Sequence, residues 1–268
     1  MDSTAQSTFI VDLAAYAQNL RVIREMIPRE CAIMAVVKGN AYGHGSVAIA
    51  QRALQAGAAM LGVATVEEAM VLRSASITAP ITVLMQPPAD AFPEAIENNL
   101  RLVLSDIDAA EKLGELARKR NRVIPIHCKV DTGMGREGLD PESVIAAMRH
   151  VTRVSHIDIE GVATHFSSAD DIDDPATANQ LRIFKQVLRQ FEKEGIPYEM
   201  AHAANSASAV AASATRPRRN LMCPLRAPRH RWATRSCMCA AVCGSVLDTA
   251  IQNAGTRGTS RRASADAT

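Results

Sequence analysis

The stretch Ala32-Ile-Met-Ala-Val-Val-Lys-Gly-Asn-Ala-Tyr-Gly-His-Gly45 joins an apolar run to a lysine and a glycine-rich turn. A short apolar run that ends in such a turn is typical of a buried strand in a parallel sheet. Lys38 then stands at the carboxyl end of the strand, where the active sites of parallel barrels open. A lysine at a strand end can simply extend its charged head into water. Partial burial would instead favour its neutral amine, the form that makes Schiff bases.

Similar apolar runs recur along the chain and alternate with amphipathic stretches. The predicted strands lie at 32–37, 60–63, 81–85, 102–104, 123–130, 157–164 and 198–201. The clearest helix follows Asp174-Pro175 and places Leu181, Phe184 and Leu188 on one face. About seven strand–helix units at this spacing favour a parallel (β/α)₈ barrel of the TIM type, an α/β fold, over an open sheet.

The composition changes near residue 214. Residues 215–268 contain ten Arg, two Asp and no Lys or Glu, a net charge of +8, whereas the whole chain carries only +2. The preceding residues therefore carry −6. No helical or strand period continues through the Arg-rich segment. We therefore predict a barrel domain over 1–214, incomplete at its eighth strand, and an irregular Arg- and Cys-rich tail over 215–268.

Three further motifs follow predicted strands. The first, Lys129-Val-Asp-Thr-Gly-Met-Gly-Arg-Glu-Gly138, is a loop whose glycines let the backbone approach a ligand and whose Arg136 enters the barrel mouth. The second contains His165, although a single histidine is more often structural than functional. The third is His202-Ala-Ala-Asn-Ser206, in which Ser206 is expected to N-cap a helix. The N-terminus of that helix is a ready phosphate site.

Together and in this order, the four motifs resemble the N-terminal barrel of the alanine racemases, over about residues 8–212. That family usually has Ala where Gly39 stands. The resemblance implies a pyridoxal 5'-phosphate (PLP) enzyme, an isomerase that interconverts L-alanine and D-alanine. Such enzymes supply D-alanine for peptidoglycan precursors or serve its catabolism.

The resemblance also implies roles for single residues. The implied cofactor-binding residues are Lys38, Tyr42 (near the phosphate), Arg136, His165, Asn205 and Ser206. Lys38 would form the Schiff base and act as one catalytic base. Arg136 would bond the phenolic oxygen of the cofactor, and Lys129 matches a lysine that in some members is carbamylated and orients this arginine. His165 would pack against the pyridine ring, and Ser206 would bind the phosphate.

Two parts of the family pattern are missing from this sequence. Racemisation needs two bases, and in the family the second is a tyrosine of a C-terminal β domain, contributed across a homodimer interface. The chain has only Tyr16, Tyr42 and Tyr198. The family's eighth strand, of the form Val-Arg-x-Gly-Ile-x-Leu-Tyr-Gly, is also absent. We therefore expect impaired turnover, and we interpret the composition break near Thr215 as a change of reading frame, which sequencing of the gene would test.

Other functions find less support in the sequence. A single-domain PLP carrier without turnover is the main alternative, but residues 40–45 and 131–138 match the racemase sequence motifs and not those of such carriers. The tail cysteines fit no common zinc spacing, so no metal is expected. The tail lacks RNA-binding signatures, so no specific nucleic-acid partner is expected either. With no secretory signal and no run long enough to cross a membrane, we expect a cytoplasmic enzyme.

Overall fold

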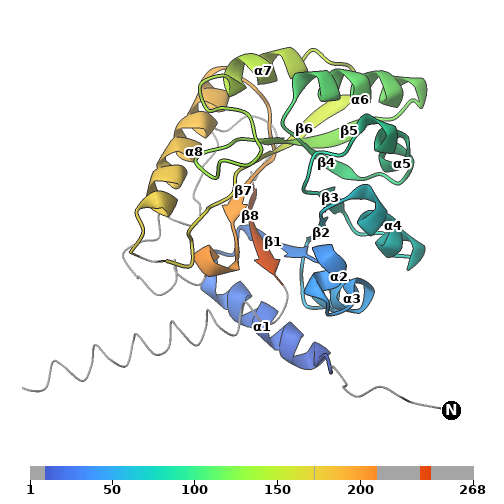
Figure 1. Ribbon diagram of the computed structural model, residues 1–268, viewed down its shortest axis with the longest axis vertical. Helices are drawn as coiled ribbons and strands as arrows, with labels where there is room; N and C mark the ends of the chain where they lie inside the picture. The colour runs from blue at the N-terminus through green and yellow to red at the C-terminus, as the bar shows by residue number, and fades with distance from the viewer. Residues whose placement is uncertain (1–9, 172, 210–235, 243–268) are drawn as a thin grey trace, which may run out of the picture.

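The computed structural model describes residues 10–171, 173–209 and 236–242. Its centre is a closed barrel of parallel strands in which each strand pairs with the next in chain order, and β8 pairs with β1 (Figure 1). The strands are β1 (Cys31–Val36), β2 (Met60–Val63), β3 (Ile81–Val83), β4 (Arg101–Leu104), β5 (Ile124–Lys129), β6 (Ile157–Ala163), β7 (Met200–Ala204) and β8 (Ser236–Val242).

Helices connect the strands and cover the outside of the barrel (Figure 1). They are α1 (Leu13–Met26), α2 (Lys38–Tyr42), α3 (Ser46–Gln55), α4 (Val66–Ser74), the 3₁₀ turn η1 (Ala89–Ala91), α5 (Phe92–Glu97), α6 (Ile107–Lys119), α7 (Val144–Val151) and α8 (Ala176–Lys193). The helix predicted after Asp174-Pro175 is α8, and the Asp174 carboxylate accepts a hydrogen bond from the Ala176 amide at 2.8 Å.

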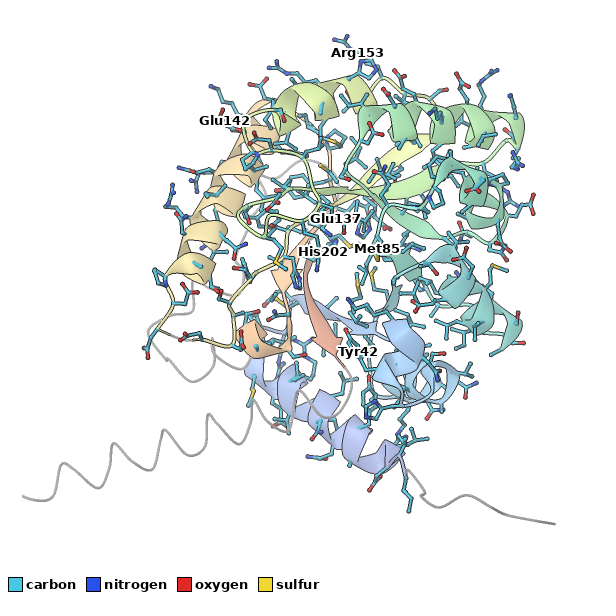
Figure 2. All side chains as sticks on the ribbon, in the orientation of Figure 1. Tyr42, Met85, Glu137, Glu142, Arg153 and His202 are labelled. Carbon is cyan, nitrogen blue, oxygen red and sulfur yellow. The ribbon has the colours of Figure 1, made fainter. Side chains whose placement is uncertain are left out.

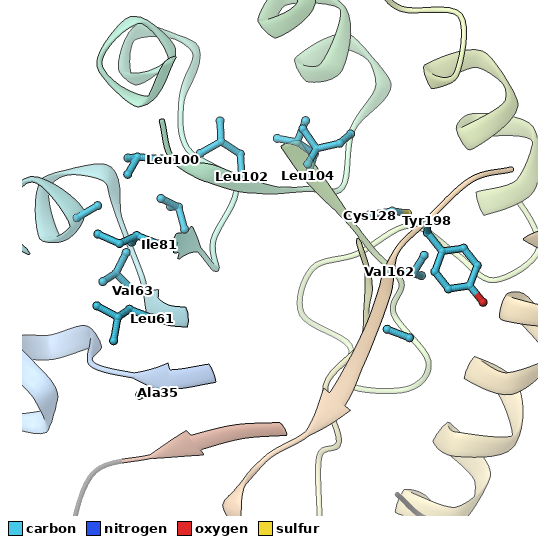
Figure 3. Close-up of a cluster of buried hydrophobic side chains, with 14 of the residues drawn as sticks. Ala35, Leu61, Val63, Ile81, Leu100, Leu102, Leu104, Cys128, Val162 and Tyr198 are labelled. Carbon is cyan, nitrogen blue, oxygen red and sulfur yellow. The ribbon is translucent and has the colours of Figure 1, made fainter. Parts of the chain in front are cut away.

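The strands present alternate side chains to two separate apolar clusters. On β1, Ile33 and Ala35 belong to the large cluster between sheet and helices, part of which is drawn in Figure 3. Met34 lies between them in sequence and belongs to a small second cluster with Met60 and Met200. This period of two is expected for a strand, and Met34 and Met60 are partners in the β1–β2 register. The small cluster therefore fills part of the barrel interior.

The predicted barrel and its first seven strands are confirmed. The eighth position differs from the expectation of an incomplete barrel, because β8 comes from the segment after residue 214 and pairs with both β7 and β1. Its sequence is not that of the family's eighth strand. Backbone pairing explains its place, since the free edges of β1 and β7 otherwise expose unpaired N–H and C=O groups. The domain boundary near residue 214 stays a prediction.

In the parts of the chain that the structure describes, no helix combines the length and the hydrophobicity that a bilayer crossing requires.

Candidate active site

The carboxyl end of the barrel brings together the residues singled out in the sequence. Lys38 begins α2 just after β1, Lys129 ends β5, and Arg136 lies in the loop that follows β5. His165 follows β6, and Asn205 comes directly after β7. In Figure 2, Tyr42 lies by α2, whereas Glu137 and His202 lie nearer the centre of the barrel. The predicted placement of all four motifs at strand carboxyl ends is therefore confirmed.

Lys38 is followed by a left-handed turn. Gly39, Asn40, Ala41 and Tyr42 have φ angles of 60°, 51°, 53° and 55°. The turn is closed by hydrogen bonds from the Ala41 amide to the Val37 carbonyl at 2.8 Å and from the Gly43 amide to the Gly39 carbonyl at 3.0 Å. Left-handed backbone costs about 1 kcal/mol for each residue that carries a Cβ. Local preference does not favour this turn, so the surroundings must stabilise it.

The amine of Lys38 is half-buried and surrounded by charge. Burial is the main cause that lowers its pKa, and the positive charges of Arg136 and Lys129 lower it further. The carboxylates of Glu68 and Glu137 act in the opposite direction without cancelling the shift. A lowered pKa makes the neutral, nucleophilic amine more accessible at neutral pH.

The loop after β5 is organised by Asp131. Its Oδ1 accepts hydrogen bonds from the amides of Gly133, Met134 and Gly135 at 2.9, 2.7 and 3.1 Å, and its Oδ2 accepts one from the Arg136 amide at 3.2 Å. Burial works to raise the pKa of Asp131, but the four amide donors together lower it below its usual value. The carboxylate therefore fixes the backbone from which Arg136 extends.

Lys129 forms an ion pair with Glu137 of the same loop. The lysine is 9% exposed, and its ammonium donates to Glu137 Oε1. The resemblance implies that this lysine can be carbamylated, which would replace its positive charge with a negative one beside Glu137. The ion pair favours the unmodified ammonium, since two adjacent anions repel one another.

His165 is held in its neutral form. Burial is the largest cause that lowers its pKa to about 4, and the positive charges of Arg136, Lys129 and Lys38 add to the effect. These shifts connect cations of the β1 turn and the β5 loop to one imidazole. The cations of both loops therefore act on a single imidazole that follows β6.

Asn205, rather than Ser206, caps the helical segment 206–209, which corrects the prediction from sequence. The Asn205 Oδ1 accepts a hydrogen bond from the Ser208 amide at 3.0 Å, the bond expected of an N-cap residue. Ser206 is the first residue of the helical segment and is 1% exposed. Asn is as good an N-cap residue as Ser, and here the Asn205 side chain reaches the amide three residues further along the chain.

A buried polar chain lies below this site, in the barrel interior. His202 on β7 contacts His127 on β5 (Nε2 to Nδ1, 2.8 Å), and His127 Nε2 lies 2.9 Å from Oε2 of Glu160 on β6. Arg101 on β4 donates to both oxygens of Glu160 at 3.0 and 2.7 Å. Burial lowers the pKa of His202 well below its usual value, with further lowering by His127 and Lys129. Each of these four side chains thus has a hydrogen-bond partner, as is usual for polar side chains in an interior.

Sequence reasoning missed several residues that shape the site. Asp131 lies within the motif 129–138, and Asp followed by Thr-Gly is a turn signature in which the carboxylate binds nearby amides. His127 interrupts an apolar strand, which marks it as a polar residue inside the barrel. Glu68 stands three residues after Thr65, the spacing of a capping box. Its contact with the Lys38 turn has no local sequence signal.

Comparison with known proteins places this barrel in a family. Residues 11–221 match the family model "Alanine racemase, N-terminal domain". Alanine racemase of Desulforamulus reducens is 41% identical over 199 residues, which are 74% of this chain and 54% of that protein. The chain thus spans about half the length of the curated relatives it matches.

Solved structures agree with this placement. Alanine racemase of Clostridium difficile 630 in complex with cycloserine superposes with a TM-score of 0.75 at 28% identity, covering 87% of this chain and 59% of that one. Alanine racemase from D-cycloserine-producing Streptomyces lavendulae has a TM-score of 0.73 at 36% identity, covering 90% and 61% of the two chains. With the barrel, the four motifs and these similarities in agreement, the chain belongs to the alanine racemase family.

Proposed function

We propose that this chain forms the cofactor-binding barrel of a PLP-dependent alanine racemase. The observation that carries the proposal is the convergence of Lys38, Lys129, Arg136 and His165 at one barrel end, where burial and the charges of Arg136 and Lys129 lower the pKa of both Lys38 and His165. The cofactor carries an anionic phosphate and a phenolic oxygen. Three cationic side chains and the N-terminus of the segment 206–209 fit such an anion, and a half-buried lysine of lowered pKa fits its aldehyde.

Each residue then has a task. When bound, PLP supplies the electron sink that stabilises negative charge at the α-carbon of the amino acid. Lys38 would hold the cofactor and would move a proton to or from one face of that carbon. Arg136, whose backbone is fixed by Asp131, would hold the phenolic oxygen. Neutral His165 would lie against the ring without adding charge. Asn205 and Ser206 would offer the helix N-terminus to the phosphate, near which Tyr42 is also assigned.

The second base is not supplied by a tyrosine on the opposite side of the described site. Tyr16 is buried on α1, and Tyr198 precedes β7, at the other end of the barrel, with its ring against Phe191. Tyr42 follows Lys38 in the same turn. We therefore propose that the 268-residue polypeptide on its own interconverts L-alanine and D-alanine slowly. Its rate should be roughly 100 to 10,000 times lower than that of an enzyme with both bases. The homodimer of the family stays a prediction for this chain.

The first experiment is an absorbance spectrum of the purified chain with PLP, before and after borohydride, followed by peptide mapping. A band that borohydride abolishes, with the label on Lys38, is the expected result. Lys38→Met should lose both the band and the label. Lys112→Met is the matched control, because Lys112 is an exposed lysine on α6, away from the barrel mouth. Labelling that persists in Lys38→Met would refute the assignment.

A PLP carrier without turnover is the alternative that the same spectrum would satisfy. It is favoured by the lack, among the described residues, of a tyrosine in position to act as a second base opposite Lys38. A chimaera that joins residues 1–214 to the eighth strand and β domain of an alanine racemase separates the two functions. Recovery of racemisation on alanine supports the racemase, whereas retained binding with no turnover supports the carrier.

A further inference from the structure

The left-handed turn after Lys38 is stabilised by a carboxylate from another strand–helix unit. Glu68, in the first turn of α4, accepts a hydrogen bond from the Gly39 amide on Oε1 and from the Ala64 amide on Oε2, both at 2.7 Å. Each carboxylate oxygen therefore has a short, charge-assisted donor. One donor belongs to the turn after β1 and the other to the segment after β2. Glu68 thus ties together two neighbouring strand ends.

This arrangement differs from an ordinary helix cap. Thr65 is the N-cap of α4, and its Oγ1 accepts a hydrogen bond from the Glu68 amide at 3.4 Å. In a capping box, the carboxylate of the third helical residue bonds the amide of the cap residue itself. Here the Glu68 carboxylate bonds Ala64, one residue earlier, and uses its second oxygen for Gly39. The neighbouring Glu67 is exposed and hydrogen-bonds Thr65 locally.

The far side of the Lys38 turn is fixed separately. The Asn40 Oδ1 accepts a hydrogen bond from the Ser46 amide at 2.9 Å, which joins the turn to the start of α3. The turn itself has three consecutive residues with a Cβ in left-handed backbone, a conformation that persists only where surrounding contacts stabilise it. Between Lys38 and this strained segment stands the Gly39 amide, and its side-chain acceptor is Glu68.

We propose that Glu68 is a positioning residue for Lys38: its carboxylate holds the backbone turn that sets where the lysine side chain begins. The proposal rests on the proposed function only in that Lys38 is taken as the cofactor lysine. The negative charge of Glu68 also acts on the Lys38 ammonium directly, opposing the burial that lowers its pKa. Loss of this charge is therefore expected to lower the pKa of Lys38 further.

Residue-resolved amide hydrogen exchange on the full chain tests the positioning role without cofactor. In Glu68→Ala, exchange at Gly39 and Ala64 should accelerate by about tenfold or more, since both amides lose a charge-assisted acceptor. Glu68→Gln should give a smaller increase, because its amide group retains one acceptor oxygen for two donors. Glu67→Gln is the matched control and should leave both amides unchanged.

A second readout follows Lys38 itself. The pH at which Lys38 becomes half-reactive toward PLP with borohydride trapping should fall in Glu68→Gln and stay unchanged in Glu67→Gln. A folded Glu68→Gln or Glu68→Ala variant with normal exchange at Gly39 and Ala64 would overturn the proposal, whatever the cofactor does. Faster exchange in the variants together with no trapping on Lys38 in the parent chain would support the positioning role and refute the proposed function.

Discussion

Two glycine-bearing loops at the carboxyl end of the barrel are stabilised in opposite ways. The loop after β5 is held from within, because Asp131 binds four amides of the five residues that follow it. The turn after β1 is held from outside, by Glu68, which lies 29 residues away from Gly39. The first device is local and can be predicted from a short motif. The second depends on two strands lying side by side, so only the fold reveals it.

The largest expected effect comes from adding a methyl group to one glycine of each loop. In the β5 loop, a Cβ at Gly138 would lie 2.5 Å from the Asp131 nitrogen and 2.9 Å from the Val130 carbonyl carbon. Gly138→Ala should therefore destabilise the protein by about 3 kcal/mol. A Cβ at Gly39 would meet nothing within 4 Å, so Gly39→Ala should cost only the left-handed backbone, about 1 kcal/mol. Urea unfolding of both variants measures the difference, and equal losses would contradict it.

A smaller effect is expected from the carboxylate that holds the β5 loop. Asp131→Ala removes the acceptor of all four amides and should lower the unfolding free energy by about 2 kcal/mol. Asp131→Asn keeps Oδ1, which serves three of the four donors, and should lose less than about 1 kcal/mol. Urea denaturation compares the two. If the alanine and asparagine variants were equally destabilised, the negative charge and not the hydrogen bonds would organise the loop.

The smallest effect is a pH dependence that reports how far burial and the loop cations together lower the pKa of His165. Its pKa is about 4 in the folded chain and near 6.5 when unfolded, so the unfolded state binds more protons between these values. Stability should therefore be complete above pH 6.5 and fall as the pH drops toward 4, with about 1 kcal/mol lost by about pH 5 after allowance for solvent screening. The pKa of buried His202 is also lowered, so this residue too makes the folded state less stable as the pH falls.

Denaturant unfolding at a series of pH values gives this curve. His165→Asn should remove part of the slope between about pH 7 and pH 5 and leave the part due to His202. A slope that His165→Asn leaves unchanged would mean that neither burial nor the loop cations lower the pKa of this imidazole in the folded chain.

The sequence was informative where structure is local. Apolar runs predicted seven strands, and the polar motifs predicted which strand ends carry the site, because a strand and the residues just after it are continuous in the chain. The cap at Asn205 was missed by one residue, since Asn and Ser are both good N-caps. β8 was missed because its seven residues lie in an Arg-rich segment without periodicity, although Cys237 to Val242 is itself a short apolar run. Glu68 and the partners of His127 required the barrel.

The row formed by His202, His127, Glu160 and Arg101 has a further consequence for hydrogen-bond polarity. An ionised Glu160 only accepts, so His127 Nε2 carries a proton. If His127 is neutral, its Nδ1 accepts from His202 Nε2, and the remaining nitrogen of neutral His202 is an acceptor. If His127 gains a proton, the bond between the rings reverses, and the same nitrogen of His202 becomes a donor. One proton on His127 thus decides whether the second ring nitrogen of His202, on β7, accepts or donates a hydrogen bond.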